Sequence, residues 1–128
     1  MSSTSFSLSP ALAGERRELS GRAGRMLCYI GGPKGGAPLL LIHSINAAAS
    51  AYEMKPLYDW AVPQGRRVFA PDLPGFGFAD RSARDYSIRL YTDAVLDVLD
   101  LVAAECGTAP LDAAAIGHPA RHAFLHHI

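Results

Sequence analysis

Residues 38–46 of the chain read PLLLIHSIN, an apolar run that passes directly into a polar segment. Just before it, residues 31–36 read GGPKGG, a dense turn signal. A short apolar run next to such a turn is typical of a strand that is covered on both faces, as in a parallel sheet. We therefore expect a buried strand over residues 38–42 and a loop over residues 43–46.

Strands and helices are predicted to alternate around this strand. Residues 47–60 have a helical composition, and a longer helix is predicted from Ser87, as its N-cap, to about Cys106. Pro119 is a suitable first residue for a closing helix. The remaining predicted strands span residues 15–20, 25–30, 67–71 and 111–116. This alternation predicts an α/β fold with a mostly parallel sheet and flanking helices.

Composition and charge narrow the class of protein. The 128 residues, 49% of them hydrophobic, suffice for one compact domain, expected over residues 15–128 after a flexible, serine-rich tail over residues 1–14. Twelve basic residues balance twelve acidic ones, so charge favours neither a nucleic acid nor a membrane surface as partner. No stretch reaches the roughly 18 apolar residues of a membrane span.

Local charge and cysteine usage give further expectations. The Arg16–Arg17 and Arg66–Arg67 pairs are expected at the solvated ends of loops. The two cysteines, Cys28 and Cys106, are too few and too far apart for a disulfide framework, so both are predicted to be reduced thiols. We therefore expect a cytoplasmic protein without a cofactor.

Three motifs, in this order, resemble the N-terminal half of the α/β-hydrolase family. The first is the apolar strand that ends at His43. The second is Asp72-Leu-Pro-Gly-Phe-Gly77, and the third is Ile116-Gly-His-Pro119, where the family carries Gly-x-Ser-x-Gly. The resemblance covers residues 16–118. It implies a partial α/β-hydrolase-like sheet and, for the full-length family, hydrolysis of an ester or another small acyl or carbon–heteroatom substrate.

The resemblance also implies where a site would lie. In an open α/β sheet, ligands bind at the carboxyl ends of the strands, so the loops that follow the three motifs would meet at one edge. By position, the backbone N–H groups of Ile45 and Ala120 would form the oxyanion hole. Ser44 stands where the family has a glycine, which indicates a modified loop path. The other residues implied at the rim are His43, Asn46, Gly117 and His118.

The residues themselves favour a structural role for two of these polar side chains. We expect His43 to hydrogen-bond to backbone rather than to act as a catalyst. We expect the Asp72 side chain to hold its own loop together, as is common where a turn begins Asp-x-Pro-Gly. Neither residue is predicted to take part in proton transfer.

The implied nucleophile is missing. Pro119 occupies its position and has no hydroxyl, thiol, carboxylate or N–H, and Arg121 replaces the closing glycine. The acid and the base come later in the family's chain order and are expected to be absent. We therefore expect a truncated, catalytically inert member of the family, whose full-length relatives act on small molecules.

The last residues allow two further readings. Four of the five histidines lie within residues 118–127, an abrupt change in composition that a frameshift or a mispredicted gene end would produce. On a helix, His118, His122 and His126 would share one face. Pro119 would place His118 outside that helix, and no further ligand completes the set, so no metal site is predicted.

A small interaction module is the alternative to an enzyme fragment. In the family, later strands cover one side of the strand predicted at residues 111–116. Without them this strand would be an exposed apolar edge, and such edges recruit partners or another copy of the same chain. Self-association through this edge is therefore a second hypothesis.

Overall fold

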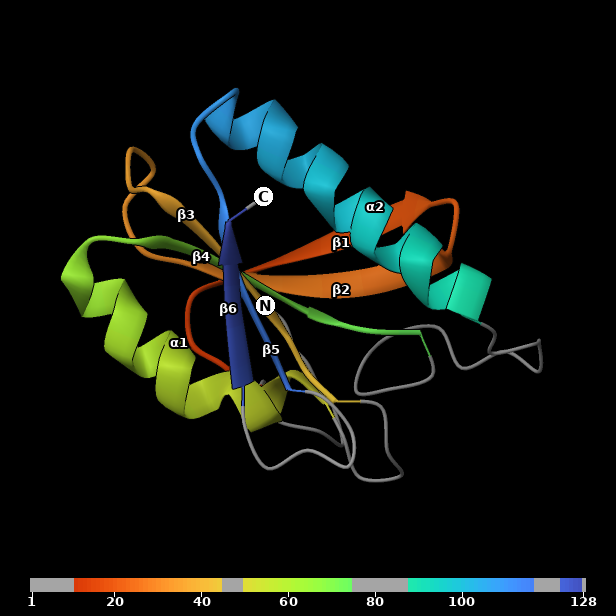
Figure 1. Ribbon diagram of the computed structural model, residues 1–128, viewed down its shortest axis with the longest axis horizontal. Coiled ribbons are helices and arrows are strands. Elements are labelled where there is room, and N and C mark those ends of the chain that lie inside the picture. The colour runs from red at the N-terminus through yellow and green to blue at the C-terminus, as the bar shows by residue number, and fades with distance from the viewer. Residues whose placement is uncertain (1–10, 45–49, 75–87, 117–122, 128) are drawn as a thin grey trace, which may run out of the picture.

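The computed structural model describes residues 11–44, 50–74, 88–116 and 123–127. They form a six-stranded sheet in the order β1-β2-β4-β3-β5-β6 (Figure 1). The strands are β1 (Glu15–Gly21), β2 (Gly24–Gly31), β3 (Pro38–Ile42), β4 (Arg67–Asp72), β5 (Asp112–Ile116) and β6 (Ala123–His127). All five strands predicted from the sequence are present, and β6 is additional.

The directions of the strands decide which loops share an edge. β3 lies between β4 and β5 and runs parallel to both, whereas the β1–β2, β2–β4 and β5–β6 pairs are antiparallel. The predicted α/β fold with flanking helices is confirmed. The sheet, however, is mixed rather than mostly parallel: among the described strands, the two parallel pairings lie at the centre and the other three pairings are antiparallel. The carboxyl ends of β3, β4 and β5 therefore lie at the same edge.

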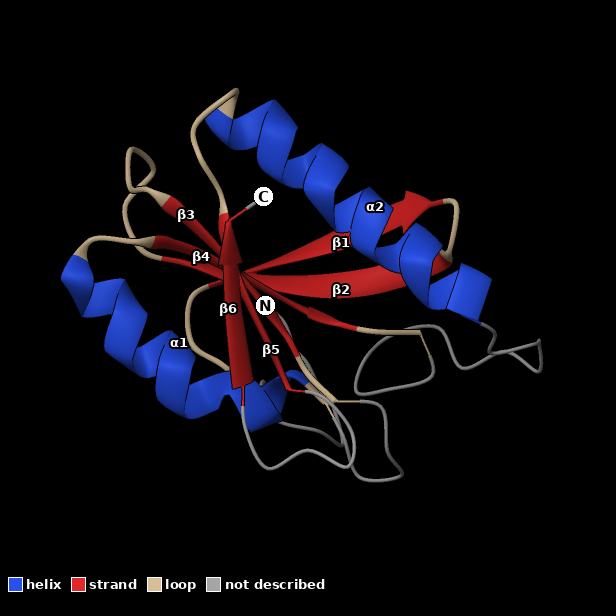
Figure 2. Cartoon of the chain, viewed as in Figure 1, coloured by secondary structure: helices blue, strands red, loops and turns tan. Residues whose placement is uncertain are grey.

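Helices cover both faces of the sheet, and Figure 2 shows one helical segment on each side. The first segment consists of η1 (Ala51–Met54), α1 (Lys55–Ala61) and η2 (Val62–Gln64), and the second is α2 (Ile88–Cys106). In β3, Leu39 and Leu41 pack in the core beneath α1, whereas Leu40 packs in the core beneath α2. This alternation explains why the whole strand is apolar, since each side chain meets a covered face.

The long helix α2 follows its apolar spacing. Leu90, Ala94, Val98 and Val102 recur every four residues and all lie in the core on one face of the sheet. The helix ends at Cys106, and the next residue, Gly107, has a φ of +65° and donates its N–H to the Ala103 carbonyl at 2.9 Å. No helix in the parts of the chain described here is long and apolar enough to cross a membrane.

Residues 11–14, expected to belong to a flexible tail, lie against the core. Leu12 is only 3% exposed and packs in the cluster beneath α1. The Ala11 N–H donates to the Tyr29 hydroxyl at 3.1 Å, and the Tyr58 hydroxyl donates to the Ala13 carbonyl at 2.6 Å. The packed part of the domain therefore begins before residue 15, while residues 1–10 lie outside the described residues.

The C-terminal end differs from the prediction. The helix expected from Pro119 is not formed over residues 123–127, which instead make β6 and pair with β5 along its whole length, from Asp112↔His127 to Ile116↔Ala123. Pairing satisfies the backbone groups that β5 would otherwise leave open at its edge, and this outweighs a local helix-start signal. His126 lies in this strand, so the helical face of histidines is also wrong. The strand edge expected to drive self-association is covered.

The Arg66–Arg67 pair is not at a solvated loop end. Arg67 is only 4% exposed, and its guanidinium donates to Glu105 at 2.6 Å and to the Gly32 carbonyl at 2.9 Å. Arg66 donates to the Pro38 carbonyl and to the Asp112 carboxylate, each at 3.0 Å. Both arginines therefore fix the start of β4 against neighbouring elements. Cys28 and Cys106 are unpaired thiols, as predicted.

Candidate functional site

The strand directions bring together two of the polar segments singled out in the sequence. His43 and Ser44 follow β3, and Asp72 ends β4, which lies beside β3 in parallel. All three side chains are buried, with His43 and Asp72 1% exposed and Ser44 2% exposed. Buried polar groups require partners, so the contacts of these residues decide what they can do.

His43 joins the segments that follow β3 and β4. Its Nε2 accepts the Leu73 N–H at 3.0 Å, so the ring proton lies on Nδ1, which donates to the Ser44 carbonyl at 2.6 Å. Burial lowers the pKa of His43 and keeps the ring neutral, although the Ser44 carbonyl and the charges of Asp72 and Glu53 act in the opposite direction. Both ring nitrogens bond to backbone, which is the structural role expected for this residue.

Ser44 is held by a carboxylate that the sequence did not single out. The Ser44 N–H donates to Glu53 Oε1 at 2.6 Å, and the Ser44 hydroxyl donates to Glu53 Oε2 at 2.8 Å. A glycine at position 44 would offer only the N–H. The serine therefore adds a second hydrogen bond between the segment after β3 and η1.

Asp72 ties the end of β4 to the same helical turn. Its Oδ1 accepts the Ala51 N–H at 2.7 Å, in the first turn of η1. Ser50 caps that turn, since its hydroxyl accepts the Tyr52 N–H at 3.2 Å. The end of β3, the start of η1 and the end of β4 are thus joined in one polar network. The hydrogen bonds to its carboxylates are of the stronger, charge-assisted kind.

The network contains His43, Ser44 and Asp72 but only part of the predicted site. The other predicted positions lie outside the described residues: Ile45, Asn46, Gly117, His118, Pro119 and Ala120. Glu53 was missed, because it lies nine residues beyond Ser44 in a segment whose pattern indicates only a helix. Among the described residues, no group of three His, Cys, Asp or Glu side chains is placed to hold a metal ion.

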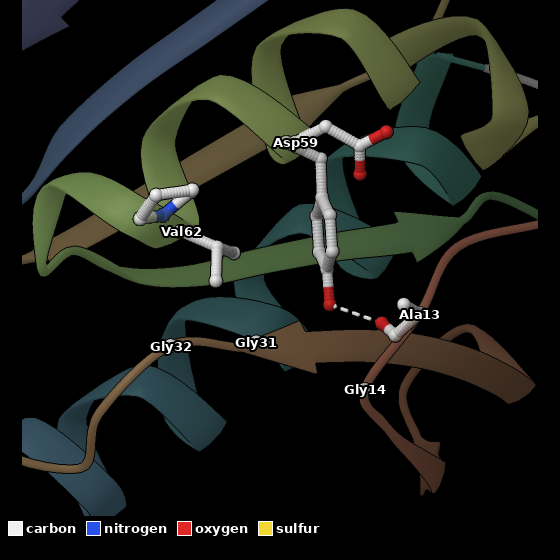
Figure 3. A pocket seen from close by; sticks show the side chains of 8 residues that line it. Ala13, Gly14, Gly31, Gly32, Asp59 and Val62 are labelled. Atoms are coloured by element: carbon white, nitrogen blue, oxygen red, sulfur yellow. Dashed lines mark hydrogen bonds between the residues drawn. The ribbon is translucent and has the colours of Figure 1, made fainter.

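A separate pocket of about 310 Å³ lies between β2 and the helical segment that contains α1. Figure 3 shows Gly31 and Gly32 facing Val62 and Asp59 across it. Because β2 is antiparallel to β4, Gly31 lies at the edge of the sheet opposite to His43. Burial raises the pKa of Tyr58, which lines the pocket, to about 12, and Asp59 pairs with Lys55. The pocket is therefore separate from the network.

Comparison with known proteins agrees with this geometry. The sequence profile of the alpha/beta hydrolase family matches residues 39–119. Over 76 residues, 55% of this chain and 24% of the relative, the sequence is 41% identical to a haloalkane dehalogenase of Psychrobacter cryohalolentis. Over 95 residues, 67% of this chain and 34% of the relative, it is 36% identical to a 2-hydroxymuconate semialdehyde hydrolase of a Pseudomonas species.

The fold also matches solved structures. The crystal structure of the epoxide hydrolase VrEH1 from Vigna radiata superposes with a TM-score of 0.67 at 20% identity, over 80% of this chain and 32% of that one. The chain thus spans about a quarter to a third of the length of the proteins it matches.

Proposed function

This chain belongs to the alpha/beta hydrolase family, and from that premise we propose that its carboxyl edge is the anion-stabilising part of a hydrolase site for small molecules. The observation that carries the proposal is the hydrogen-bonded network in which the half-buried Glu53 joins the buried residues His43, Ser44 and Asp72. It fixes the segments after β3 and β4 at the edge where ligands of open α/β sheets bind.

The proposed chemistry is stabilisation of developing negative charge. In this family, a backbone N–H from the loop after the third strand and one from the residue after the nucleophile form the oxyanion hole. Here these donors would be the N–H groups of Ile45 and Ala120. Such donors act best when they are fixed before the reaction, and losing one costs roughly 2.7–4 kcal/mol. A rigid network directly before Ile45 supports this assignment.

The proposed substrate class is a small molecule with an acyl or carbon–heteroatom bond. The relatives are named as a haloalkane dehalogenase, a semialdehyde hydrolase and an epoxide hydrolase. The bonds named there differ, but all belong to small organic molecules.

We further propose that the chain binds anions at this edge without turning substrate over. Pro119 stands where the motif requires a nucleophile and has no group that can attack carbon. His43 is neutral and bonded to backbone at both nitrogens, so it does not supply a base at the described edge.

Two assays of the purified chain test the proposal. A 4-nitrophenyl ester, a bromoalkane and an epoxide are each expected to hydrolyse no faster than in buffer. Sodium benzoate, a stable carboxylate, is expected to bind saturably and to shift the Ile45 amide signal in NMR spectra. Saturable hydrolysis that persists after removal of residues 117–128 would show that the chain does turn substrate over, contrary to the proposal. No benzoate binding would refute the anion site.

A further inference from the structure

We propose that the pocket between β2 and α1 binds a small organic ammonium ion, an apolar molecule with one protonated amine that is held at Asp59. The pocket lies at the edge of the sheet opposite to His43. Binding there is independent of the function proposed for the carboxyl edge, because the two places share no residue among those described.

The pocket has the size and the lining of a small-molecule site. Its volume of about 310 Å³ lies at the lower end of the range for ligand pockets, roughly 300–1,000 Å³. Figure 3 shows Gly31 and Gly32 facing Val62 across it, so one wall is backbone without side chains and the other is apolar. Pro63 extends the apolar wall. Such a lining fits a compact apolar molecule.

The polar side chains of the pocket accept hydrogen bonds. The Tyr58 hydroxyl donates its proton to the Ala13 carbonyl at 2.6 Å, so toward a ligand it can only accept (Figure 3). Burial raises the pKa of Tyr58 to about 12, so the hydroxyl stays protonated and neutral at pH 7. The carboxylate of Asp59 is also an acceptor only. These two acceptors favour a ligand that brings donors.

Charge selects an ammonium group among the possible donors. Asp59 is the only charged side chain among the described residues that line the pocket. Its carboxylate is 47% exposed, which places it at the mouth, and it pairs with Lys55, whose side chain is 45% exposed. An exposed pair of this kind contributes little, because water solvates both groups. A cation whose apolar body also fills the pocket can therefore displace Lys55.

Two variants change the charge at the mouth in opposite directions. Asp59→Asn keeps the shape of the side chain and removes its charge, whereas Lys55→Ala removes the cation that competes for Asp59. Matched controls come from the Arg25–Glu18 pair of the β1–β2 hairpin, whose side chains are 66% and 62% exposed and lie outside the lining. The controls are Glu18→Gln and Arg25→Ala.

The experiment titrates the purified chain with benzylammonium chloride at pH 7 and constant ionic strength. NMR spectra follow the amide signals of Gly31, Gly32 and Val62. These signals are expected to shift saturably, with a dissociation constant of about a millimolar. Benzyl alcohol, which has the same ring and no charge, should shift the same signals but bind about fivefold more weakly.

The variants are expected to respond to the charge of the ligand. Asp59→Asn should bind benzylammonium about fivefold more weakly than wild type and should bind benzyl alcohol equally well. Lys55→Ala should bind benzylammonium about twofold more tightly, because the competing cation is gone. The two control variants should match wild type. A purely structural role of Asp59 would alter the affinity for both ligands alike.

A lysine side chain of another protein carries the same ammonium group on a flexible chain. Nα-acetyl-lysine methylamide represents this source in a separate titration. It is expected to bind about fivefold more weakly than benzylammonium, because its chain loses more conformational freedom on binding than a rigid ring does. Tighter binding of the lysine compound would point to a protein partner and would overturn the proposal of a free small molecule.

Three other results would overturn the proposal: no saturable shift of the three amide signals, equal affinity of wild type for benzyl alcohol and benzylammonium, or equal affinity of wild type and Asp59→Asn for benzylammonium. All four substituted side chains are at least 45% exposed, so the variants are expected to melt close to wild type. Benzoate binding at the carboxyl edge is unaffected by each of these results, so the two proposals fail separately.

Discussion

The Nε2 atom of His43 accepts the backbone N–H of Leu73 at 3.0 Å, across 30 residues of sequence. This bond joins the segments that follow two parallel strands. Both residues are 1% exposed, so water does not replace the bond when it is lost. The neutral ring therefore holds the carboxyl edge of the sheet together, and its removal and its protonation should have distinct effects.

Removing the ring should destabilise the fold. His43→Ala leaves the buried Leu73 N–H without its acceptor and opens a cavity, with an expected loss of about 2–4 kcal/mol in the free energy of unfolding. Urea denaturation measures the difference. Arg25→Ala, which removes an exposed side chain of β2, is the control and should change stability by less than about 0.5 kcal/mol. If His43→Ala lowers the free energy of unfolding no more than the control does, the His43 ring does not contribute to stability.

Protonating the ring should weaken the fold at mildly acidic pH. Burial lowers the folded-state pKa of His43 below the unfolded value of about 6.5. Between these two values the unfolded chain binds more protons, so the free energy of unfolding falls as the pH falls. The contribution is fully present above about pH 7 and is lost from about pH 6.5 down to the folded pKa. Urea denaturation from pH 8 to pH 5 measures this.

The comparison with His43→Ala isolates the contribution of this ring from those of the carboxylates. The variant should lack the part of the pH dependence that begins near pH 6.5, which leaves a flatter curve there. Identical slopes in wild type and variant would mean that His43 has the same pKa in both states.

The strands and α2 were predictable because their signals are local. The apolar run of residues 38–42 and the apolar positions that recur at spacings of three and four within residues 90–103 each describe one element with its own covered face. The end of the chain was not predictable in this way. Pro119 is a favourable first residue of a helix, and this local signal led to the predicted helix. In the structure, a strand pairs with the backbone groups at the edge of β5, and the local sequence does not indicate that pairing.

The same distinction between local signals and long-range contacts applies to the residues of the candidate site. His43 and Asp72 could be identified because each directly follows or ends a predicted strand. The partner of Ser44 could not, because Glu53 reaches it only through the way η1 packs on the sheet. Likewise, the sequence predicts that Arg67 lies at a solvated loop end. Its partner Glu105 could not be predicted, because it lies 38 residues further along the chain and meets Arg67 only when α2 packs on the sheet.

The Arg67–Glu105 pair should be costly to break. The Arg67 side chain is 5% exposed, and Glu105→Ala would leave its charge buried with only the Gly32 carbonyl and a longer contact to Glu15. We expect a loss of about 3 kcal/mol in the free energy of unfolding. Thermal denaturation measures it. The double variant Arg67→Met/Glu105→Leu should recover most of the loss, and a double variant no more stable than Glu105→Ala would contradict this account.

Two glycines give a matched test of packing around the pocket beneath α1. A Cβ at Gly31 would lie 2.5 Å from the Tyr58 hydroxyl oxygen, whereas a Cβ at Gly35 meets nothing within 4 Å. Gly31→Ala should therefore lower the free energy of unfolding by about 1–3 kcal/mol. Gly35→Ala should be neutral or stabilising by up to about 1 kcal/mol, because it restricts the unfolded chain. Equal melting temperatures for the two variants would rule out close packing of Tyr58 on Gly31.

Removing residues 117–128 tests the role of β6. In the structure β6 pairs with all five residues of β5, so the shortened chain would expose the backbone groups of an apolar strand. We expect it to form dimers or larger species at concentrations where the intact chain is monomeric, because unpaired apolar edges associate. Size-exclusion chromatography coupled to light scattering distinguishes these states. A shortened chain that stays monomeric and folded would show that β5 does not need the strand beside it.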